Sequence, residues 1–199
     1  MRHALPVRQV SADGPADPEL SDAGHEQARH LAAYLRSEAI HALYASPMRR
    51  ARETAAPVAE AIGLAITIVD GVAEFDRHQG EYIPAEEMKA TNHPRWQAMM
   101  AGERLESDIP PEDFHADVVS SVEAVIEANP GRKAVIVCHG GVINAYLTHV
   151  LGLPAGPGFF YPNYTSIHRV AASRGGVKSI LTMNETAHLR GTGLPVGLA

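Results

Sequence analysis

The sequence predicts an α/β fold, a three-layer α/β/α sandwich with a mostly parallel central sheet. Short apolar or β-branched runs alternate with longer segments of helical periodicity along the 199 residues. One run, 134–138, is apolar throughout, which is typical of a strand buried on both faces of a parallel sheet. No internal repeat or linker divides the sequence. We therefore expect one domain over residues 1–199, with an inserted lid at about 76–118.

Local signals at the ends of helices place the elements. Ser21 is a good N-cap for the first helix. Ser46 and Pro47 combine a capping residue with proline at the first helical position, and Gly63 is a favourable end for the same helix. Glycine and proline beyond Arg190 predict a frayed tail. In chain order, we expect strands at 1–3, 40–45, 65–69, 134–138, 166–172 and 177–183, and helices at 22–38, 46–62, 85–100, 112–128 and 140–151.

The acidic residues are concentrated in one segment. The formal net charge is -6, and the whole excess lies between Glu81 and Asp117, where nine acidic residues accompany three basic ones. Proteins that bind nucleic acids usually show a basic face, so this composition argues against a nucleic-acid partner. We expect the lid at 76–118 to be acidic.

The sequence favours a cytoplasmic protein. Cys138 is the single cysteine, which excludes an internal disulfide framework and suits a reducing compartment. No stretch is long and apolar enough to span a bilayer, and no secretory signal precedes His3. We expect no membrane partner, and the sequence leaves a homodimer open.

Two histidines are expected to share one pocket. His3 follows the first predicted strand, and His139 follows the strand at 134–138. In open parallel sheets, ligands bind beyond the carboxyl ends of the strands, so both imidazoles can reach the same site. Gly140 leaves backbone amides bare at one helix start, and the helix start at Ser46 carries arginines in its first turn. Arginines and helix dipoles near one histidine describe a site for a dianion.

Together these residues resemble the histidine phosphatase superfamily, also called phosphoglycerate-mutase-like. That family has Arg-His-Gly near the N-terminus, Ser-Pro-x-x-Arg-Ala-x-x-Thr-Ala at a helix start, a central Glu and a late Ser/Cys-His-Gly-Gly. The resemblance covers nearly the whole chain, and this sequence departs from it at Ala4 and in the short strand before His3. The matching elements are Arg2-His3-Ala4, Ser46 to Ala55, Glu74 and Cys138-His139-Gly140-Gly141.

The resemblance implies phosphoryl transfer through a phosphohistidine, without a metal or another cofactor. His3 would attack phosphorus as a neutral nucleophile, and Glu74 would protonate the leaving oxygen and then activate water. His139 would donate a hydrogen bond as an imidazolium. The expected phosphate-binding residues are Arg2, Arg50, Gly140 and Gln9, the last at a position where the family often has asparagine.

Other interpretations of single residues stay open at this point. Three nearby carboxylates could replace Glu74 as the proton donor: Asp76, Glu81 and Glu86. Arg49 and Arg52 are better interpreted as a solvated helix face, and Arg77-His78 as substrate contacts or plain loop. Cys138 should face away from the site, because neighbouring strand residues point to opposite sides. The other histidines are interpreted as structural or surface residues: His25, His30, His41, His93, His115, His149, His168 and His188.

Two reactions can use such a site. A phosphatase lets water take the phosphoryl group, whereas a mutase returns it to another hydroxyl and needs basic residues in its lid to bind a second anionic group. The lid here is acidic and offers apolar side chains: Met88, Trp96, Met99, Met100 and Phe114. We therefore expect a phosphatase that acts on small phosphomonoesters. A non-catalytic phosphate-binding module and a metallohydrolase are the alternatives, although no HxxxH or HxH spacing supports a metal site.

Overall fold

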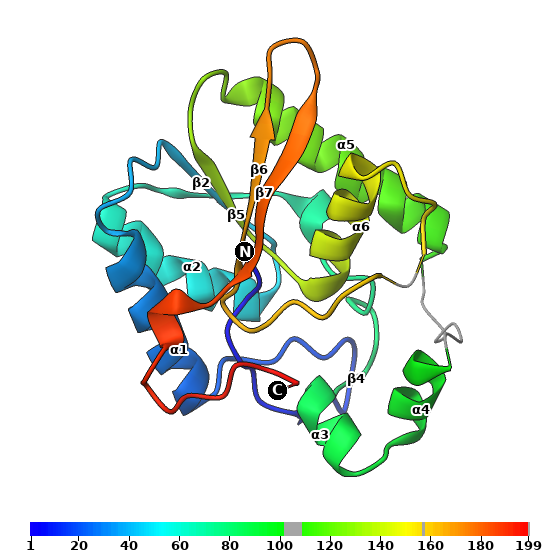
Figure 1. Cartoon of the computed structure of the whole chain (residues 1–199). Coiled ribbons are helices and arrows are strands. Elements are labelled where there is room, and N and C mark those ends of the chain that lie inside the picture. The colour runs from blue at the N-terminus through cyan, green and yellow to red at the C-terminus, as the bar shows by residue number, and fades with distance from the viewer. Residues whose placement is uncertain (102–108, 157, 199) are drawn as a thin grey trace.

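The computed structural model describes residues 1–101, 109–156 and 158–198 (Figure 1). The strands are β1 (Gln9–Val10), β2 (Ala42–Ala45), β3 (Ile66–Ile68), β4 (Glu81–Tyr82), β5 (Ala134–Val137), β6 (Ile167–Ala172) and β7 (Lys178–Glu185). The helices are α1 (Asp22–Leu35), α2 (Arg49–Ile62), α3 (Ala85–Ala90), α4 (Pro94–Met100), α5 (Pro111–Ala128) and α6 (Gly140–Val150), with short 3-10 helices η1 (Asp70–Val72) and η2 (Ala187–Leu189).

The central sheet is parallel, with the strand order β3-β2-β5. In β2, Leu43 lies opposite Ile66 of β3 on one side and opposite Val135 of β5 on the other. Helices α1 and α2 cover one face of this sheet, and α5 and α6 cover the other (Figure 1). The predicted three-layer α/β/α architecture is therefore confirmed.

Alternation along β5 supplies side chains to a core on each face of the sheet. Val135 and Val137 pack in the core that contains residues of α1 and α2, such as Leu31. Ile136 and Cys138 pack in the second core, which α5 and α6 build with η1. Because successive strand residues point to opposite faces, a continuous apolar run is what this position requires.

Residues 1–3 occupy the place of a further parallel strand beside β5. Arg2 forms an isolated parallel bridge with Cys138, and the His3 N–H donates to the Cys138 carbonyl at 2.9 Å. On the other side, the Arg2 N–H donates to the Ser166 carbonyl at 3.1 Å, and the Thr165 N–H donates to the His3 carbonyl at 3.3 Å. Backbone hydrogen bonds therefore fix the position of His3 from two sides.

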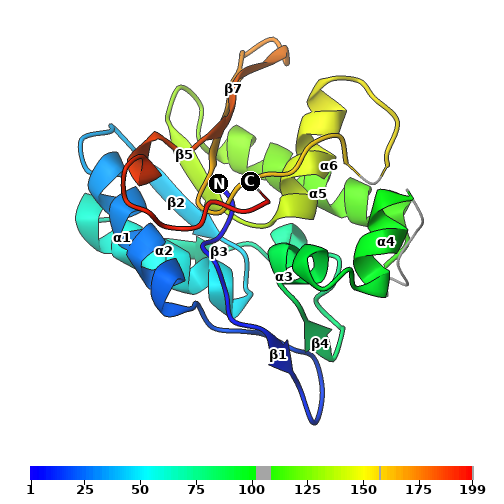
Figure 2. The same ribbon diagram turned by 60° about the horizontal axis from the view of Figure 1, so that its bottom comes forward.

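The remaining strand pairs are antiparallel. β6 and β7 form a hairpin that projects beyond the central sheet at the top of Figure 1. β1 pairs with β4, which places Gln9 opposite Tyr82. Figure 2 shows this small ribbon below α3, at the opposite end of the molecule from the β6–β7 hairpin. It joins the segment after His3 to the segment 76–118.

Two helix predictions were wrong in detail. α2 begins at Arg49 with Met48 as its N-cap, and no side chain caps it, so Ser46 does not start this helix. The single helix expected at 85–100 is broken between α3 and α4. Asn92 has a positive φ of 49° at the break, and Pro94, which has no N–H to donate, starts the next helix.

The tail beyond Arg190 is packed, so the expectation of fraying was wrong. The Tyr164 N–H donates to the Val196 carbonyl at 3.0 Å. The Lys89 ammonium donates to the Leu198 carbonyl at 3.3 Å, and Leu198 also packs against the apolar cluster of α3. The tail runs from beside α1 to beside α3 in Figure 1. Contacts made at long sequence distance hold it, and local composition does not encode them.

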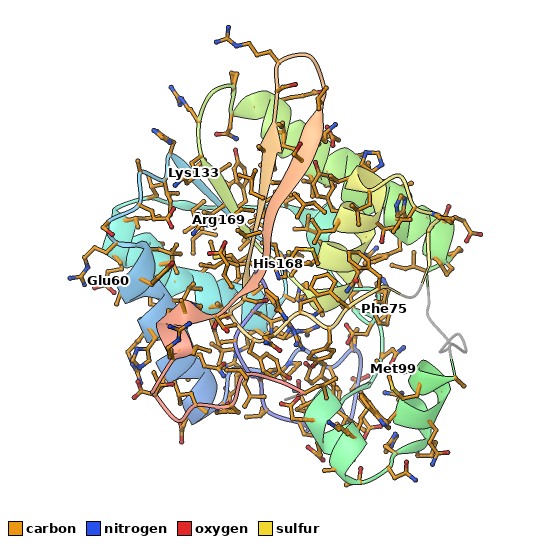
Figure 3. All side chains as sticks on the ribbon, viewed as in Figure 1. Glu60, Phe75, Met99, Lys133, His168 and Arg169 are labelled. Carbon is orange, nitrogen blue, oxygen red and sulfur yellow. The ribbon has the colours of Figure 1, made fainter. Side chains whose placement is uncertain are left out.

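The segment 76–118 carries β4, α3, α4 and the start of α5, while residues 102–108 lie outside the described residues. The acids Glu103, Glu106 and Asp108 fall in that part. α3 and α4 lie at the lower right of Figure 1, away from the central sheet. Met99 of α4 is 36% exposed and Met100 is 62% exposed, and Figure 3 labels Met99 in this region. Met88 and Phe114 are buried.

Candidate active site

The rings of His3 and His139 meet beyond the carboxyl ends of neighbouring strands. Their centroids are 5.1 Å apart, and the ring planes are inclined by 55°. His3 ends the short strand at 1–3, and His139 follows β5 as the N-cap of α6. Both side chains are buried, at 2% and 0% exposure. The structure therefore brings together the two histidines that the sequence placed in one pocket.

The hydrogen bond of His3 determines which ring nitrogen is free. Its Nδ1 lies 2.7 Å from the Ala4 carbonyl, and a carbonyl oxygen can only accept, so Nδ1 carries the proton. Nε2 is then left with its lone pair. Burial, followed by the positive charges of Arg50 and Arg2, holds the pKa of His3 well below its usual value. The ring is therefore neutral and its Nε2 is nucleophilic.

Ser46 orients the second imidazole. Its hydroxyl lies 2.7 Å from Nε2 of His139 and accepts a hydrogen bond from the Met48 N–H at 3.3 Å. The hydroxyl proton is then available to Nε2, which leaves Nδ1 of His139 as the protonated nitrogen. This Nδ1 is buried and has no partner among the described residues. Ser46 thus supports His139 and does not cap α2, which begins at Arg49.

His139 is not an imidazolium in these surroundings. Burial, followed by Arg50, His3 and Arg2, holds its pKa well below the usual value. A neutral ring still donates one hydrogen bond from Nδ1. A dianion beside the ring would favour its protonated form, so the imidazolium expected from the sequence depends on a bound phosphate.

Arg2 and Arg50 both act on His3 through their charge, and each has buried donors without partners in the described structure. Arg50 is 1% exposed, and its Nε and Nη1 are buried without partners in the described part of the chain. Arg2 is 6% exposed; its Nη1 donates to the Pro162 carbonyl at 2.6 Å, and its Nε is likewise buried without a partner. Leaving such groups unpaired costs stability, so their arrangement indicates a binding site for an anion.

The side chain of Glu74 lies at the N-terminus of α6, and the residue is 7% exposed. Its carboxylate accepts from the Gly141 N–H at 2.8 Å and from the Phe75 N–H at 3.2 Å. Burial, followed by the charge of Asp76, raises the pKa of Glu74 to about 7, against the opposing effects of Gly141 and Arg50. A carboxyl group with such a pKa can give and take a proton near neutral pH. Figure 3 labels the neighbouring Phe75, which lies beside α6.

Glycines make room for these groups. A Cβ atom at position 141 would lie 2.3 Å from Oε1 of Glu74, so only glycine fits without displacing the carboxylate. At Gly140, a Cβ would meet Arg2 Nε no closer than 4.0 Å. Gly140 therefore lies next to Arg2 at the start of α6, where its sequence position suggested a phosphate contact.

Gln9 lies on β1, next to the strand that carries Tyr82. Its Oε1 is buried without a partner in the described structure, and the residue lies opposite Tyr82. A phosphate contact of the Gln9 amide stays a prediction. Tyr82 in turn lies with its ring centroid 4.7 Å from Cζ of Arg50.

Several other candidates lie outside this group. Arg49 pairs with Glu19 and Glu53 on the surface, and Arg52 is exposed, as a solvated helix face predicts. Arg77 contacts His78, and Glu81 pairs with Arg8 on the surface. Glu86, in contrast, accepts from the hydroxyl of Tyr164, whose ring lies 4.1 Å from Cζ of Arg2, so this carboxylate reaches the edge of the site. Cys138 is buried in the second core, and burial raises its pKa.

Sequence reasoning missed three tyrosines beside the arginines. Cζ of Arg2 lies 4.1 Å from the ring centroid of Tyr164 and 4.7 Å from that of Tyr161, and Tyr82 faces Arg50. Aromatic faces stabilise buried guanidinium groups without using their N–H donors. No local pattern distinguished these tyrosines, because their role depends on which arginine the fold brings beside them.

The described residues contain no group of three or more His, Cys, Asp or Glu side chains arranged to hold a metal ion. Positive charge at the site comes from the two buried arginines. Metal independence stays a prediction, which turnover in the presence of a chelator would test.

Comparison with known proteins gives consistent results. The model of the histidine phosphatase superfamily (branch 1) matches residues 1–186. A probable phosphatase of Schizosaccharomyces pombe is 28% identical over 93% of this chain and 67% of its own length. A probable phosphoglycerate mutase, GpmB, of Yersinia enterocolitica is 26% identical over 77% of this chain and 74% of its own. The solved structure of a mycobacterial glucosyl-3-phosphoglycerate phosphatase shares the fold, with a TM-score of 0.74, 22% identity and coverage of 93% and 96%.

Proposed function

The chain belongs to the histidine phosphatase superfamily (branch 1), and we propose that it hydrolyses small phosphomonoesters through a phosphohistidine on His3. The observation that carries this proposal is a set of buried donors without partners around one nucleophilic nitrogen. Nε of Arg2, Nε and Nη1 of Arg50 and Nδ1 of His139 are all of this kind. The charges of both arginines act on the ring of His3, whose centroid lies 5.1 Å from that of His139.

In the first step, Nε2 of His3 attacks phosphorus as the bond between phosphorus and the ester oxygen breaks. The proton of Glu74 goes to the leaving oxygen, so the product leaves as an alcohol. Arg2, Arg50 and His139 balance the charge on the three equatorial phosphoryl oxygens. In the second step, water attacks the phosphohistidine, Glu74 takes the proton of that water, and inorganic phosphate leaves.

Hydrolysis fits the surroundings better than transfer to a second hydroxyl. A mutase has to bind a second anionic group, for which basic side chains are required. The described part of 76–118 contributes Glu81, Glu86 and Glu87 near α3, and Arg8 is paired with Glu81 and Glu87 on the surface. We therefore propose a phosphatase, and a mutase remains the second candidate that kinetics must test.

Adjacent arginines offer a matched test of the proposal. Arg50→Gln should lower kcat/KM for p-nitrophenyl phosphate by about 100-fold, the usual effect of removing a charged donor from a transition state. Arg49→Gln changes the same residue type one position away, where the side chain is 46% exposed and paired on the surface, and should leave kcat/KM within about twofold.

His3→Ala completes the test, because it should abolish turnover and the acid-labile phosphoenzyme that rapid quenching traps on the unmodified protein. Turnover that persists in His3→Ala would refute the proposal. Binding of phosphate without turnover in the unmodified protein would instead favour a non-catalytic module. Turnover that a chelator abolishes would favour a metallohydrolase. Transfer of the phosphoryl group to a phosphorylated hydroxy acid, faster than to water, would favour a mutase.

We further propose that a small phosphorylated molecule is the partner of this site and that the protein acts in the cytoplasm. The single cysteine and the acidic charge balance support this proposal. Among the described helices, none combines the length and apolar character needed to cross a membrane. Fractionation of cells followed by detection of the protein would test the location, and sedimentation would show whether it is a homodimer.

A further inference from the structure

A second carboxylate lies in the same turn as Glu74. Asp76 follows Glu74 by two residues, and the turn is closed by the Arg77 N–H on the Glu74 carbonyl at 3.2 Å and by the Gln79 N–H on the Asp76 carbonyl at 3.0 Å. The Glu74 N–H is itself directed at the sulfur of Met48, 3.4 Å away. The turn therefore fixes the backbone of Glu74 beside Met48, the N-cap of α2, with Asp76 two residues further on.

Asp76 forms an ion pair with Arg50, one of the two buried arginines of the proposed phosphate site. Its Oδ1 accepts from Nη2 of Arg50 at 3.2 Å, and the two side chains are 22% and 1% exposed. No other described carboxylate lies within ion-pair distance of Arg50. Because Nη2 is bound to Asp76, the guanidinium is oriented with Nε and Nη1 free for an anion. The ring of Tyr82 covers a face of the same group and leaves these donors in place.

The groups around Glu74 act in opposite directions on its proton. Burial is the largest effect that favours the carboxylic acid form of Glu74, and the charge of Asp76 is the next. The carboxylate form is favoured by the amides of Gly141 and Phe75 and by the charge of Arg50. The thiol of Cys138, the residue after β5, also interacts electrostatically with Glu74. Asp76 is therefore the charge that opposes ionisation of Glu74.

We propose that Asp76 is a positioning residue for this reaction: it orients Arg50 and places a negative charge beside Glu74, which keeps the proton on Glu74 until the leaving oxygen takes it. Asp76 itself exchanges no proton with the substrate. This inference rests on the proposed function, because it assigns Asp76 a role within that same site.

Asp76→Asn separates the charge from the hydrogen bond. Asparagine keeps an oxygen that accepts from Arg50, so the guanidinium stays oriented. The negative charge beside Glu74 is lost. Glu74 should then ionise at lower pH. The alkaline limb of the kcat/KM profile for phenyl phosphate, which reports the proton donor, should move to lower pH by about one unit.

Asp70→Asn is the matched control, because Asp70 is exposed on η1 and makes no ion pair in the described structure. The same loss of one charge there should leave the limb in place. Asp76→Glu should retain the wild-type limb, since it keeps the charge. The second ionisation of phenyl phosphate is common to all variants and cancels from the comparison.

Two results would overturn the inference. An alkaline limb of Asp76→Asn that coincides with wild type would show that its charge does not act on Glu74. Loss of the limb together with a fall of 100-fold or more in kcat for phenyl phosphate would show that Asp76 is itself the proton donor. Both results leave phosphohistidine catalysis intact. The proposed function fails separately, if His3→Ala turns over substrate as fast as the unmodified protein.

Discussion

Replacing Gly141 with alanine tests whether Glu74 must occupy its observed position. The new Cβ would lie 2.3 Å from Oε1 of Glu74 and 2.9 Å from Cδ1 of Phe75, whereas ordinary contacts are 3.4–4 Å. The carboxylate would have to retreat by about 1 Å, a displacement that commonly costs about 100-fold when it moves a reacting group. It would also lose the 2.8 Å hydrogen bond from the Gly141 N–H.

The size of the loss should depend on the leaving group. Phenolate is a poor leaving group and needs the proton of Glu74, so kcat/KM for phenyl phosphate should fall about 100-fold in Gly141→Ala. p-Nitrophenolate leaves without protonation, so p-nitrophenyl phosphate should lose about tenfold or less. The assay is release of inorganic phosphate from both esters under identical conditions.

Gly140→Ala serves as the folding control, because its Cβ would meet no described atom closer than 4.0 Å. Its Tm should match that of wild type, and the Tm of Gly141→Ala shows how much of any loss comes from unfolding. Equal losses for both esters in a folded Gly141→Ala protein would refute the assignment of Glu74 as the acid. Asp76 or Glu86 would then be the next candidates.

Two further predictions concern Ser46 and Glu38. Ser46→Ala removes the 2.7 Å contact to Nε2 of His139, so kcat/KM for p-nitrophenyl phosphate should fall about tenfold with an unchanged Tm; activity equal to wild type would show that His139 needs no such support. Hydrogen bonds, of which the one from Arg169 has the largest effect, lower the pKa of Glu38 to about 2. The contribution of ionised Glu38 to the stability of the fold is therefore complete above its ordinary pKa of 4.5 and is lost as pH falls towards 2. Urea unfolding should show Glu38→Gln less stable than wild type by about 1 kcal/mol at pH 7 and equal to it near pH 2, whereas Glu60→Gln, on the exposed side of α2, should match wild type at both.

Much of the fold could be predicted because its signals are local. The apolar run at 134–138 specified a strand buried on both faces, and Gly63 ended α2 with a left-handed φ of 70°. The meeting of His3 and His139 also followed from the sequence, since the ends of neighbouring parallel strands are close by geometry. Residue types at strand ends therefore carried most of the information about the site.

The parts that could not be predicted depend on contacts between distant residues. Ser46 looked like a helix cap, but it supports His139, 93 positions away in sequence. The tyrosines near Arg2 come from positions 161 and 164, and nothing local in that stretch indicates a guanidinium beside them. The packed tail gave the same difficulty, because glycine and proline favour both a frayed end and an ordered irregular one.

The tyrosines also explain how the site keeps unpaired donors buried. Each buried polar group without a partner costs about 1–3 kcal/mol, and Arg2 and Arg50 together leave three such nitrogens. Aromatic faces offset part of that cost, since they attract the charge of a guanidinium without accepting its in-plane N–H donors. Backbone hydrogen bonds on both sides of His3 hold this residue near the guanidinium groups of Arg2 and Arg50. Fixed donors need no reorganisation when charge develops on a phosphoryl group, so the energy that the fold forgoes in keeping them unpaired is recovered in the transition state.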